Sequence, residues 1–415
     1  MQMKTLSIAI LFCASAAFAA APQFSNVTVS QSASDNLVTI GYSLSATAIV
    51  TCSVETNAGD DVWVAIPEKD FVSVFGDVNR EVAGGDGKSI RWCPARDWPN
   101  HGLARSDIRA KLTAWDPVDP PDYMVVDLAV SNAVSYYVST NALPGGIGDD
   151  RYRLEKLVMR RIHAAGETFR MGSPATESAR TNPSANWSET THPVSFTHDY
   201  WMGVCEFTNG QELRVCYTNS PSTFHTSSEA DFYLCPVETI NYATVHGDSE
   251  SVGSETLLKR LQNLTGVAFD LPTEAEWEFA ARAGVEAGLP NGKEIYNNDK
   301  SPNSTDTIAW TRSNAGNVTH PVGLKEPNNW GLYDVIGNVQ EFCRDIAKKE
   351  LGADYAVDPT GPDFEAGKSH IVRGGECRWT VQNNRLATRA AASVSGSQSA
   401  KGDYGFRVWA PCPVK

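Results

Sequence analysis

The feature of this sequence that most constrains its fold is a long stretch, from about residue 155 onward, in which hydrophobic periodicity is scarce. Trp, Asn, Gly and Arg are dense there. A domain with few helices and sheet ladders must satisfy its buried backbone groups in other ways. Amide and guanidinium groups can donate to loop carbonyls, and Gly permits positive φ. We therefore expect a loop-rich scaffold in which many Asn and Arg side chains are structural.

Two helices stand out within this stretch. The first spans residues 255–264 and places four leucines on one face, namely Leu257, Leu258, Leu261 and Leu264. The second spans 274–283: Thr273 is its N-cap, Glu276 completes a capping box and Gly284 ends it. We expect internal ion pairs to hold the irregular segments in place, with scaffold roles for Glu274, Glu276, Trp277, Arg282 and Arg407.

The sequence before this stretch has a different pattern. Between residues 22 and 137, short runs alternate apolar and polar residues and are separated by Gly, Asn, Asp and Pro clusters. This pattern predicts an Ig-like β-sandwich, with Cys52 and Cys93 in strands where they could bridge two sheets. Residues 138–154 contain Pro-Gly-Gly and Gly-Asp-Asp and are predicted to be a linker. The fold class is therefore α+β, with a second domain over 155–412.

The N-terminus and the charge indicate where the protein acts. Residues 1–19 have a basic start, an apolar run and a small-x-small end at Ala17–Ala19, which predicts a secretory signal peptide. No later stretch is long and apolar enough to cross a membrane. Lys and Arg number 35 and Asp and Glu 49, a net charge of −14, which argues against nucleic-acid binding. We expect an exported protein, periplasmic or extracellular.

Export also bears on the cysteines. Nine are present, and removal of Cys13 with the signal peptide leaves eight. An even number in an oxidising compartment predicts disulfides. No C-x-x-C pair occurs, which argues against a zinc ribbon or a thioredoxin-like site.

Eight short segments of the second domain resemble the formylglycine-generating enzyme, or sulfatase-modifying factor, family in the family's order. They are FRMGS at 169–173, ETTHPV at 189–194, CEFTN at 205–209, LPTEAEWEFAAR at 271–282, HPVG at 320–323, PNNWGLYDVIGNV at 327–339, RGG at 373–375 and GFR at 405–407. The resemblance covers roughly residues 155–411. It implies a C-type-lectin-like fold with little regular secondary structure.

The resemblance also implies a metal site. Calcium prefers hard oxygen ligands that mix carboxylates with carbonyls. In the family, four matching positions bind a structural calcium, through the two acidic side chains and the carbonyls between them. Here these positions hold Asp334, Gly337, Val339 and Glu341. We expect calcium there; the alternative is a turn whose acids only cap local N–H groups.

The catalytic cysteines are where the sequence departs from the family. The family's oxidase binds Cu(I) with two cysteines, four and nine residues after the second Gly of the Arg-Gly-Gly motif. Soft thiolates suit this ion, but the two positions here hold Trp379 and Asn384. Glu376 replaces a Ser beside the bound thiol. Copper is therefore not expected, and Cys377 is the one candidate thiol; a disulfide from Cys377 to Cys343 or Cys412 is the alternative.

Two functions stay open. One is a non-oxidase binding or structural module whose groove, formed by Arg373, Glu376, Trp379, Asn384 and Arg407, holds a peptide or glycan. The other is an active enzyme that converts a sulfatase Cys or Ser to formylglycine. Other reaction classes have little support, since no Gly-x-Ser-x-Gly elbow or His-x-x-x-His motif is present.

Overall fold

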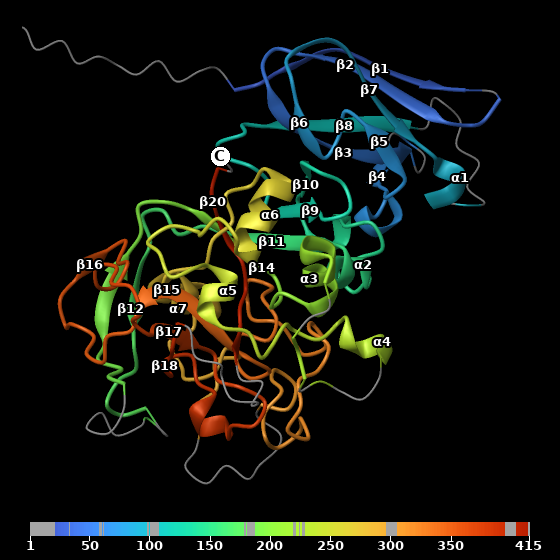
Figure 1. The fold of residues 1–415 in the computed structure, drawn as a ribbon. Helices are drawn as coiled ribbons and strands as arrows, with labels where there is room; N and C mark the ends of the chain where they lie inside the picture. Colours follow the sequence, from blue (N-terminus) through green and yellow to red (C-terminus); the bar gives the residue numbers. More distant parts are fainter. Residues whose placement is uncertain are drawn as a thin grey trace, which may run out of the picture.

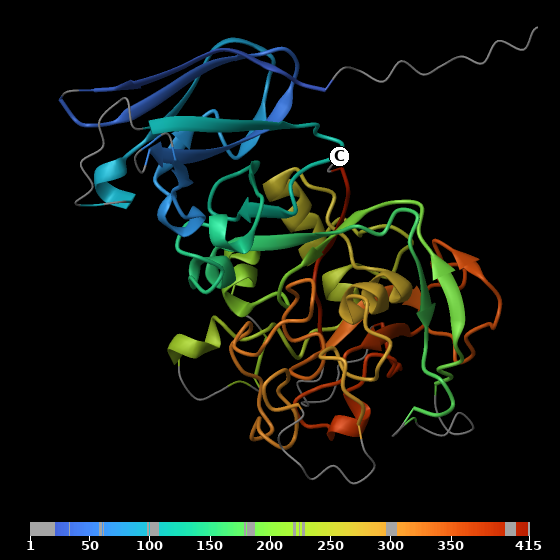
Figure 2. The ribbon, with the colours of Figure 1, turned by 180° about the vertical axis from the view of Figure 1, so that it is seen from behind.

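The computed structural model describes residues 21–413 except 33, 58–59, 61, 98, 100–107, 178–179, 181–186, 219–220, 224, 226–228, 296–304 and 395–403. The proposed signal peptide, residues 1–19, lies wholly outside the described residues. Figures 1 and 2 show a small β-structure, coloured blue, beside a larger body that holds the rest of the chain. Among the described residues, no helix is sufficiently long and apolar to cross a membrane.

The small body consists of two β-sheets with a hydrophobic core between them. One sheet has the order β1-β2-β7-β5, formed by Phe24–Gln31, Val38–Leu44, Gly85–Trp92 and Val74–Gly76. The other has the order β4-β3-β6 with β8 also paired to β3, formed by Trp63–Ala65, Ala48–Asn57, Arg80–Val82 and Ile108–Trp115. Alternation along β2 buries Val38, Ile40 and Tyr42. The β-structure is as expected, and its Ig-like character stays a prediction.

Two strands that lie within the predicted sandwich range 22–137 belong to the larger body instead. β9 (Tyr123–Asp127) and β10 (Ala133–Tyr137) pair with each other, and β9 pairs with β11 (Lys156–Ile162). The sheet continues through β14 (Tyr200–Gly203) to β20 (Trp409–Pro411). The structure thus pairs these two strands with the larger body, whereas the sequence predicts a boundary at residue 137. Alternation indicates a half-buried strand but not its partner.

The predicted linker is also packed into the larger body. It contains η3 (Thr140–Ala142) and α2 (Arg151–Leu154), and Leu143 and Tyr152 are buried against Val158 and Val204. The structure thus has packed residues where the sequence predicts a linker over 138–154. Its Gly and Pro residues make turns within a packed segment, a use that composition alone does not distinguish from a spacer.

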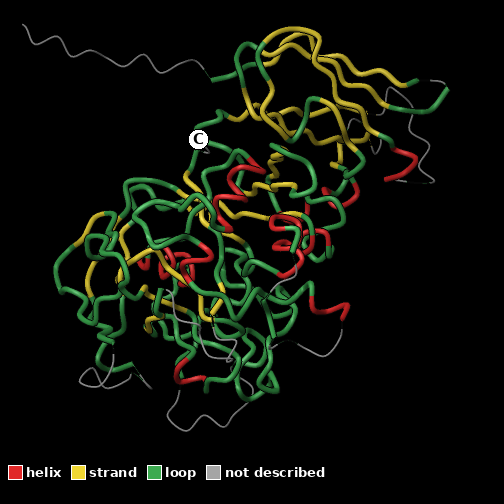
Figure 3. The backbone as a smooth tube through the Cα atoms, in the orientation of Figure 1, coloured by secondary structure: helices red, strands yellow, loops and turns green. Residues whose placement is uncertain are grey.

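The larger body adds two small sheets. One has the order β12-β13-β16, formed by Thr168–Met171, His192–Ser195 and Ala356–Val357. The other has the order β18-β17-β15-β19, formed by Ala390–Ala392, His370–Arg373, Gln340–Ile346 and Tyr404–Gly405. Most of the remaining chain in this body is loop (Figure 3), as the scarce periodicity predicts.

Both predicted helices are present. α6 spans Leu257–Thr265 and buries Leu257, Leu258 and Leu261. α7 spans Glu274–Arg282 and begins with the expected capping box of Thr273 and Glu276. The other short helices are α1 (Pro94–Asp97), α3 (Asn209–Cys216), α4 (Glu229–Phe232), α5 (Tyr242–Val245), η1 (Glu68–Asp70) and η4 (Val381–Asn383).

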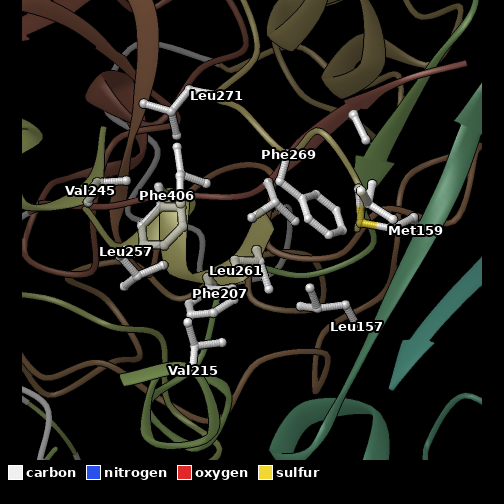
Figure 4. Packing of buried hydrophobic residues seen from close by; sticks show 14 of the residues in the cluster. Leu157, Met159, Phe207, Val215, Val245, Leu257, Leu261, Phe269, Leu271 and Phe406 are labelled. Atoms are coloured by element: carbon white, nitrogen blue, oxygen red, sulfur yellow. The ribbon is translucent and has the colours of Figure 1, made fainter. Parts of the chain in front are cut away.

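The main core joins segments that are distant in sequence. Figure 4 shows Phe207, Leu261, Phe269 and Phe406 packed around one another, with Met159 of β11 nearby. Phe207 and Phe406 stack with ring centroids 5.0 Å apart. This core holds the sheet, α6 and the C-terminal segment together, and so fixes the frame from which the loops extend.

Candidate functional site

The loop that follows β17 contains Trp379 and Asn384, the two positions that the resemblance matches to the cysteines of the family's oxidase. Gly374 and Gly375 both have positive φ, at 88° and 75°. A Cβ atom on Gly375 would lie 1.9 Å from the Asn384 side chain. Asn384 is fully buried, and its Nδ2 donates to the carbonyls of Glu376, Trp379 and Thr380 at 3.0–3.2 Å. Asn384 therefore holds the loop closed.

Cys377 lies in the same loop but is not exposed. Its side chain is buried, and its backbone N–H donates to the Asn338 carbonyl at 3.0 Å. Burial raises the pKa of the Cys377 thiol to about 12. A nucleophile or a copper ligand must be a thiolate, and this thiol stays protonated at neutral pH. With Trp379 and Asn384 at the other positions, these residues do not fit a Cu(I) ion.

The predicted groove is only partly open. Trp379 is partly exposed, whereas Glu376 is buried, with its carboxylate accepting from Arg378 Nε at 3.0 Å. Burial raises the pKa of Glu376. Arg373, Asn384 and Arg407 are fully buried, so they cannot line a groove. The sequence does not reveal their burial, because the same residue type occurs both inside a scaffold and at a surface.

Arg373 shows what these buried cations do. Its guanidinium pairs with Glu274 and Glu278 and donates to the Leu386 and Thr388 carbonyls at 2.8 and 3.1 Å. It also lies over the Trp277 ring, 5.2 Å from the centroid. Loop carbonyls that have no partner in a sheet thus accept hydrogen bonds from an arginine that is itself paired with carboxylates. The prediction of internal ion pairing is confirmed.

The same arrangement recurs at other buried arginines. Arg385 pairs with Glu177 and Glu189, and Arg389 pairs with Glu274 through both carboxylate oxygens at 2.6 and 2.8 Å. Arg389 also donates to the carbonyls of Ser188 and Lys349. Pairing and hydrogen bonding together offset the cost of burying each charge.

The predicted calcium positions lie close to the buried ion pair of Glu341 and Arg407. Glu341 accepts from Arg407 with both oxygens, at 2.6 and 2.7 Å, and also from Trp277 Nε1 at 2.6 Å. Asp334 Oδ2 accepts from the Gly323 N–H at 2.7 Å. Asp334 Oδ1 is buried and has no partner among the described residues. Burial raises the pKa of Asp334 to about 6.

Glu206 is a member of this group that sequence analysis did not single out. It is buried, and its carboxylate accepts from Asn338 Nδ2 at 2.7 Å and from the Val339 N–H at 3.1 Å. Burial and the neighbouring Asp334 raise the pKa of Glu206 well above its ordinary value. Its place in the family segment 205–209 was visible, but nothing in the sequence placed it beside Asp334.

These residues fit calcium in part. The unpartnered oxygen of Asp334 and the surplus of buried carboxylates both favour a cation. Glu341, however, is already neutralised by Arg407, and no group of three His, Cys, Asp or Glu residues in the described part of the chain is placed to hold a metal ion. Asp334, with the carbonyls of Gly337 and Val339, is the donor set that remains.

The expected disulfides are absent from the part of the chain that the structure describes. No disulfide joins the cysteines that the structure describes, and the predicted bridge between Cys52 and Cys93 is absent. Cys343 and Cys377 are both buried thiols. The prediction rested on an even number of cysteines in an exported protein. In the structure, Cys235, Cys343 and Cys377 are buried, as small apolar side chains are.

Comparison with known proteins gives the family. A family model described as "Sulfatase-modifying factor enzyme 1-like domain" matches residues 156–410, more than half of the 415 residues. The chain belongs to this family. The matched region contains most of the loop-rich body and the Gly374–Gly375 turn.

Individual relatives carry different names. A formylglycine-generating enzyme of Thermomonospora curvata is 34% identical over 144 residues, which are 32% of this chain and 47% of the relative. A serine/threonine-protein kinase pkn1 of Chlamydia pneumoniae is 34% identical over 139 residues, 33% of this chain and 20% of the relative. This chain thus spans less than half the length of either protein. Among solved structures, Treponema denticola variable protein 1 matches with a TM-score of 0.48 and 24% identity, covering 62% of this chain and 95% of that one.

Proposed function

We propose that this chain is an exported binding or structural module that uses the sulfatase-modifying factor scaffold without its oxidase chemistry. The observation that carries the proposal is the loop at 374–384. Trp379 and Asn384 stand where the family's oxidase has its copper-binding cysteines, and neither side chain supplies a thiolate. Asn384 is moreover committed to three loop carbonyls.

Cys377 does not offer a replacement for the missing pair. A thiol that acts as a nucleophile is normally accessible and has a lowered pKa. Cys377 is 1% exposed, and burial raises its pKa to about 12. The alternative function, formylglycine formation at a sulfatase Cys or Ser, therefore rests on family membership and on the names of relatives alone.

The proposed ligand is a peptide or a glycan. Binding modules commonly present a partly exposed aromatic ring beside polar groups, and Trp379 next to the Arg378–Glu376 pair has this character. Calcium is part of the proposal as a structural ion held by Asp334 and the carbonyls of Gly337 and Val339. Its role there is to neutralise buried carboxylates rather than to take part in chemistry.

A Cu(I) competition titration tests the proposal. The mature protein is mixed with Cu(I) and a chromophoric Cu(I) chelator, with the Thermomonospora curvata relative as a positive control. We expect the relative to take copper from the chelator and this chain to take none that depends on the 374–384 loop. Stoichiometric uptake that is lost in Cys377→Ser would contradict the proposal.

A further inference from the structure

A cavity lies at one end of the β15–β17 pair, and the 374–384 loop follows the opposite end. β15 and β17 pair Glu341 with Arg373 at one end and Ile346 with His370 at the other. The cavity at the His370 end has a volume of about 250 Å³. It is lined by α5, by the segment after it and by the long connection from β15 to β17, including Tyr242, Glu250, Arg344, Asp363, Phe364 and His370.

Two buried side chains on the wall of this cavity carry polar atoms without partners. Tyr242 and His370 are 0% and 1% exposed, and their rings stack with centroids 3.4 Å apart. Neither the Tyr242 hydroxyl nor His370 Nε2 has a hydrogen-bond partner within the described chain. Buried polar atoms are nearly always satisfied, so a pair of neighbouring exceptions on a cavity wall indicates a partner from outside the chain.

The hydrogen-bonding roles of the two atoms differ. His370 Nδ1 lies 2.9 Å from the Arg344 carbonyl, which can only accept, so Nδ1 carries the proton. Burial lowers the pKa of His370 to about 4, and the ring is therefore neutral. Nε2 is left as an acceptor, whereas the Tyr242 hydroxyl has its proton to donate. An alcohol group on a ligand both donates and accepts, and so satisfies either atom.

The rest of the lining favours a neutral ligand with several hydroxyl groups. Arg344 brings a positive charge, and Glu250 and Asp363 bring negative charges. A simple cation would meet Arg344, and a simple anion would meet two carboxylates. Hydroxyl groups can accept from the guanidinium and donate to the carboxylates. Phe364 and Ile346 add an apolar surface for the C–H face of a sugar ring.

The connection from β15 to β17 is fixed over this site. Gly367 N–H donates to both oxygens of Asp248 at 3.0 Å, which ties the connection to the segment that carries Ser249 and Glu250. Arg344 lies 3.5 Å from Asp270, which orients its guanidinium from the other side. The cavity is therefore bounded by restrained segments and is of a size for one sugar ring rather than an extended chain.

We propose that this cavity binds a single saccharide unit, through hydrogen bonds to the Tyr242 hydroxyl and His370 Nε2. The inference rests on the proposed function as a binding module, names a glycan as its ligand and places the site away from Trp379. Glu250, Asp363 and Arg344 complete the recognition of ring hydroxyls.

Saturation-transfer NMR on the mature protein tests the proposal, with free D-glucose, D-galactose, D-mannose and N-acetyl-D-glucosamine as probes. Tyr242→Phe removes only the hydroxyl, which has no partner in the free protein, so it should leave Tm unchanged. We expect at least one sugar to bind and Tyr242→Phe to weaken that binding about tenfold. Tyr217→Phe, at a residue that is 80% exposed, is the matched control and should bind like the wild type.

Other outcomes overturn the proposal. If none of the four sugars binds, or if Tyr242→Phe binds as well as the wild type, water satisfies the two atoms and the cavity is no sugar site. Binding lost in Trp379→Ala but kept in Tyr242→Phe would move the glycan to the 374–384 loop. The last result rejects this cavity while leaving the proposed binding function in place, whereas copper uptake through Cys377 would reject the function itself.

Discussion

Individual residues fix the conformation of the 374–384 loop. The turn needs Gly at 374 and 375 because both have positive φ, and the Asn384 side chain occupies the space that a Cβ on Gly375 would need. Three carbonyls depend on Asn384 Nδ2. Asn384 thus serves the loop as a hydrogen-bonding group.

The first prediction concerns Cys377. Because the thiol is buried and its pKa is raised to about 12, we expect iodoacetamide to label Cys377 only after unfolding. Peptide mapping by mass spectrometry, before and after addition of urea, measures this directly. Cys216, which is partly exposed on α3, serves as the internal comparison. Rapid labelling of Cys377 in the native protein would show that the loop opens.

A second prediction concerns the pH dependence of stability. Burial, with Glu274 nearby, raises the pKa of Asp345 to about 7, while its Oδ2 accepts the Glu274 N–H at 2.7 Å. The folded state therefore keeps a proton that the unfolded chain releases near pH 4. Between pH 4 and 7 this group lowers the free energy of unfolding as pH rises, by up to about 4 kcal/mol.

Asp345→Asn removes that effect, since the amide oxygen can still accept the Glu274 N–H. We expect the variant to match the wild type at pH 4 and to be more stable at pH 8, by urea unfolding at each pH. Asp354→Asn, at an exposed position, is the control and should track the wild type throughout. A variant that is no more stable at pH 8 would show that Asp345 ionises normally.

At the scale of elements, buried ion pairs connect the strands and helices of the larger body to its loops. Arg407 joins Glu341 of β15 to the carbonyls of Gly203 and Tyr333 at 3.0 and 2.9 Å. Such a pair adds little to the stability of the fold compared with apolar side chains of similar size. Removing one partner, however, leaves an uncompensated buried charge. The pairs therefore specify how the elements meet.

A third prediction follows for Arg407→Met. It leaves Glu341 buried without its counterion and should lower the free energy of unfolding by about 3–5 kcal/mol, measured by urea unfolding. The double variant with Glu341→Met should recover part of that loss. Arg80→Met, in an exposed pair with Asp77, should cost at most about 1 kcal/mol. An equal loss in the free energy of unfolding for Arg407→Met and Arg80→Met would contradict this role of the buried pair.

The predicted calcium site belongs to the β15 region and gives a fourth prediction. If Asp334 supplies a ligand, calcium at about 100 times its Kd should stabilise the fold by about 2.7 kcal/mol. A chelator should then lower Tm, and Asp334→Asn should abolish the response. Exposed Glu326→Gln is the control. A Tm that ignores calcium, or a response unchanged in Asp334→Asn, would remove calcium from the account.

For the whole molecule, the boundary between the bodies lies before β9, near the Pro-rich residues 117–121. Met124 and Val126 of β9 are fully buried in the main core. A fifth prediction is that a chain starting at residue 117 folds, whereas one starting at 138 is insoluble because it lacks β9 and β10. Expression tests and circular dichroism measure both. A soluble, folded chain from 138 would restore the boundary that the sequence suggests.

Much of this architecture was predictable from local signals. The capping box predicts α7, and the four leucines predict the apolar face of α6. The dense Asn and Arg residues predict a loop-rich body with internal ion pairs. Pairing between distant segments was not predictable. Alternation in β9 does not name β11 as its partner, and neither Glu206 beside Asp334 nor Tyr242 against His370 has a sequence spacing that reveals the contact.

The central claim is that the scaffold is retained and the oxidation is not. The most direct test incubates the mature protein with copper, oxygen and a Cys-x-Pro-x-Arg peptide, and measures the product by mass spectrometry beside the Thermomonospora curvata relative. We expect conversion by the relative and an unchanged peptide with this chain. Loss of the peptide thiol with gain of an aldehyde would contradict it.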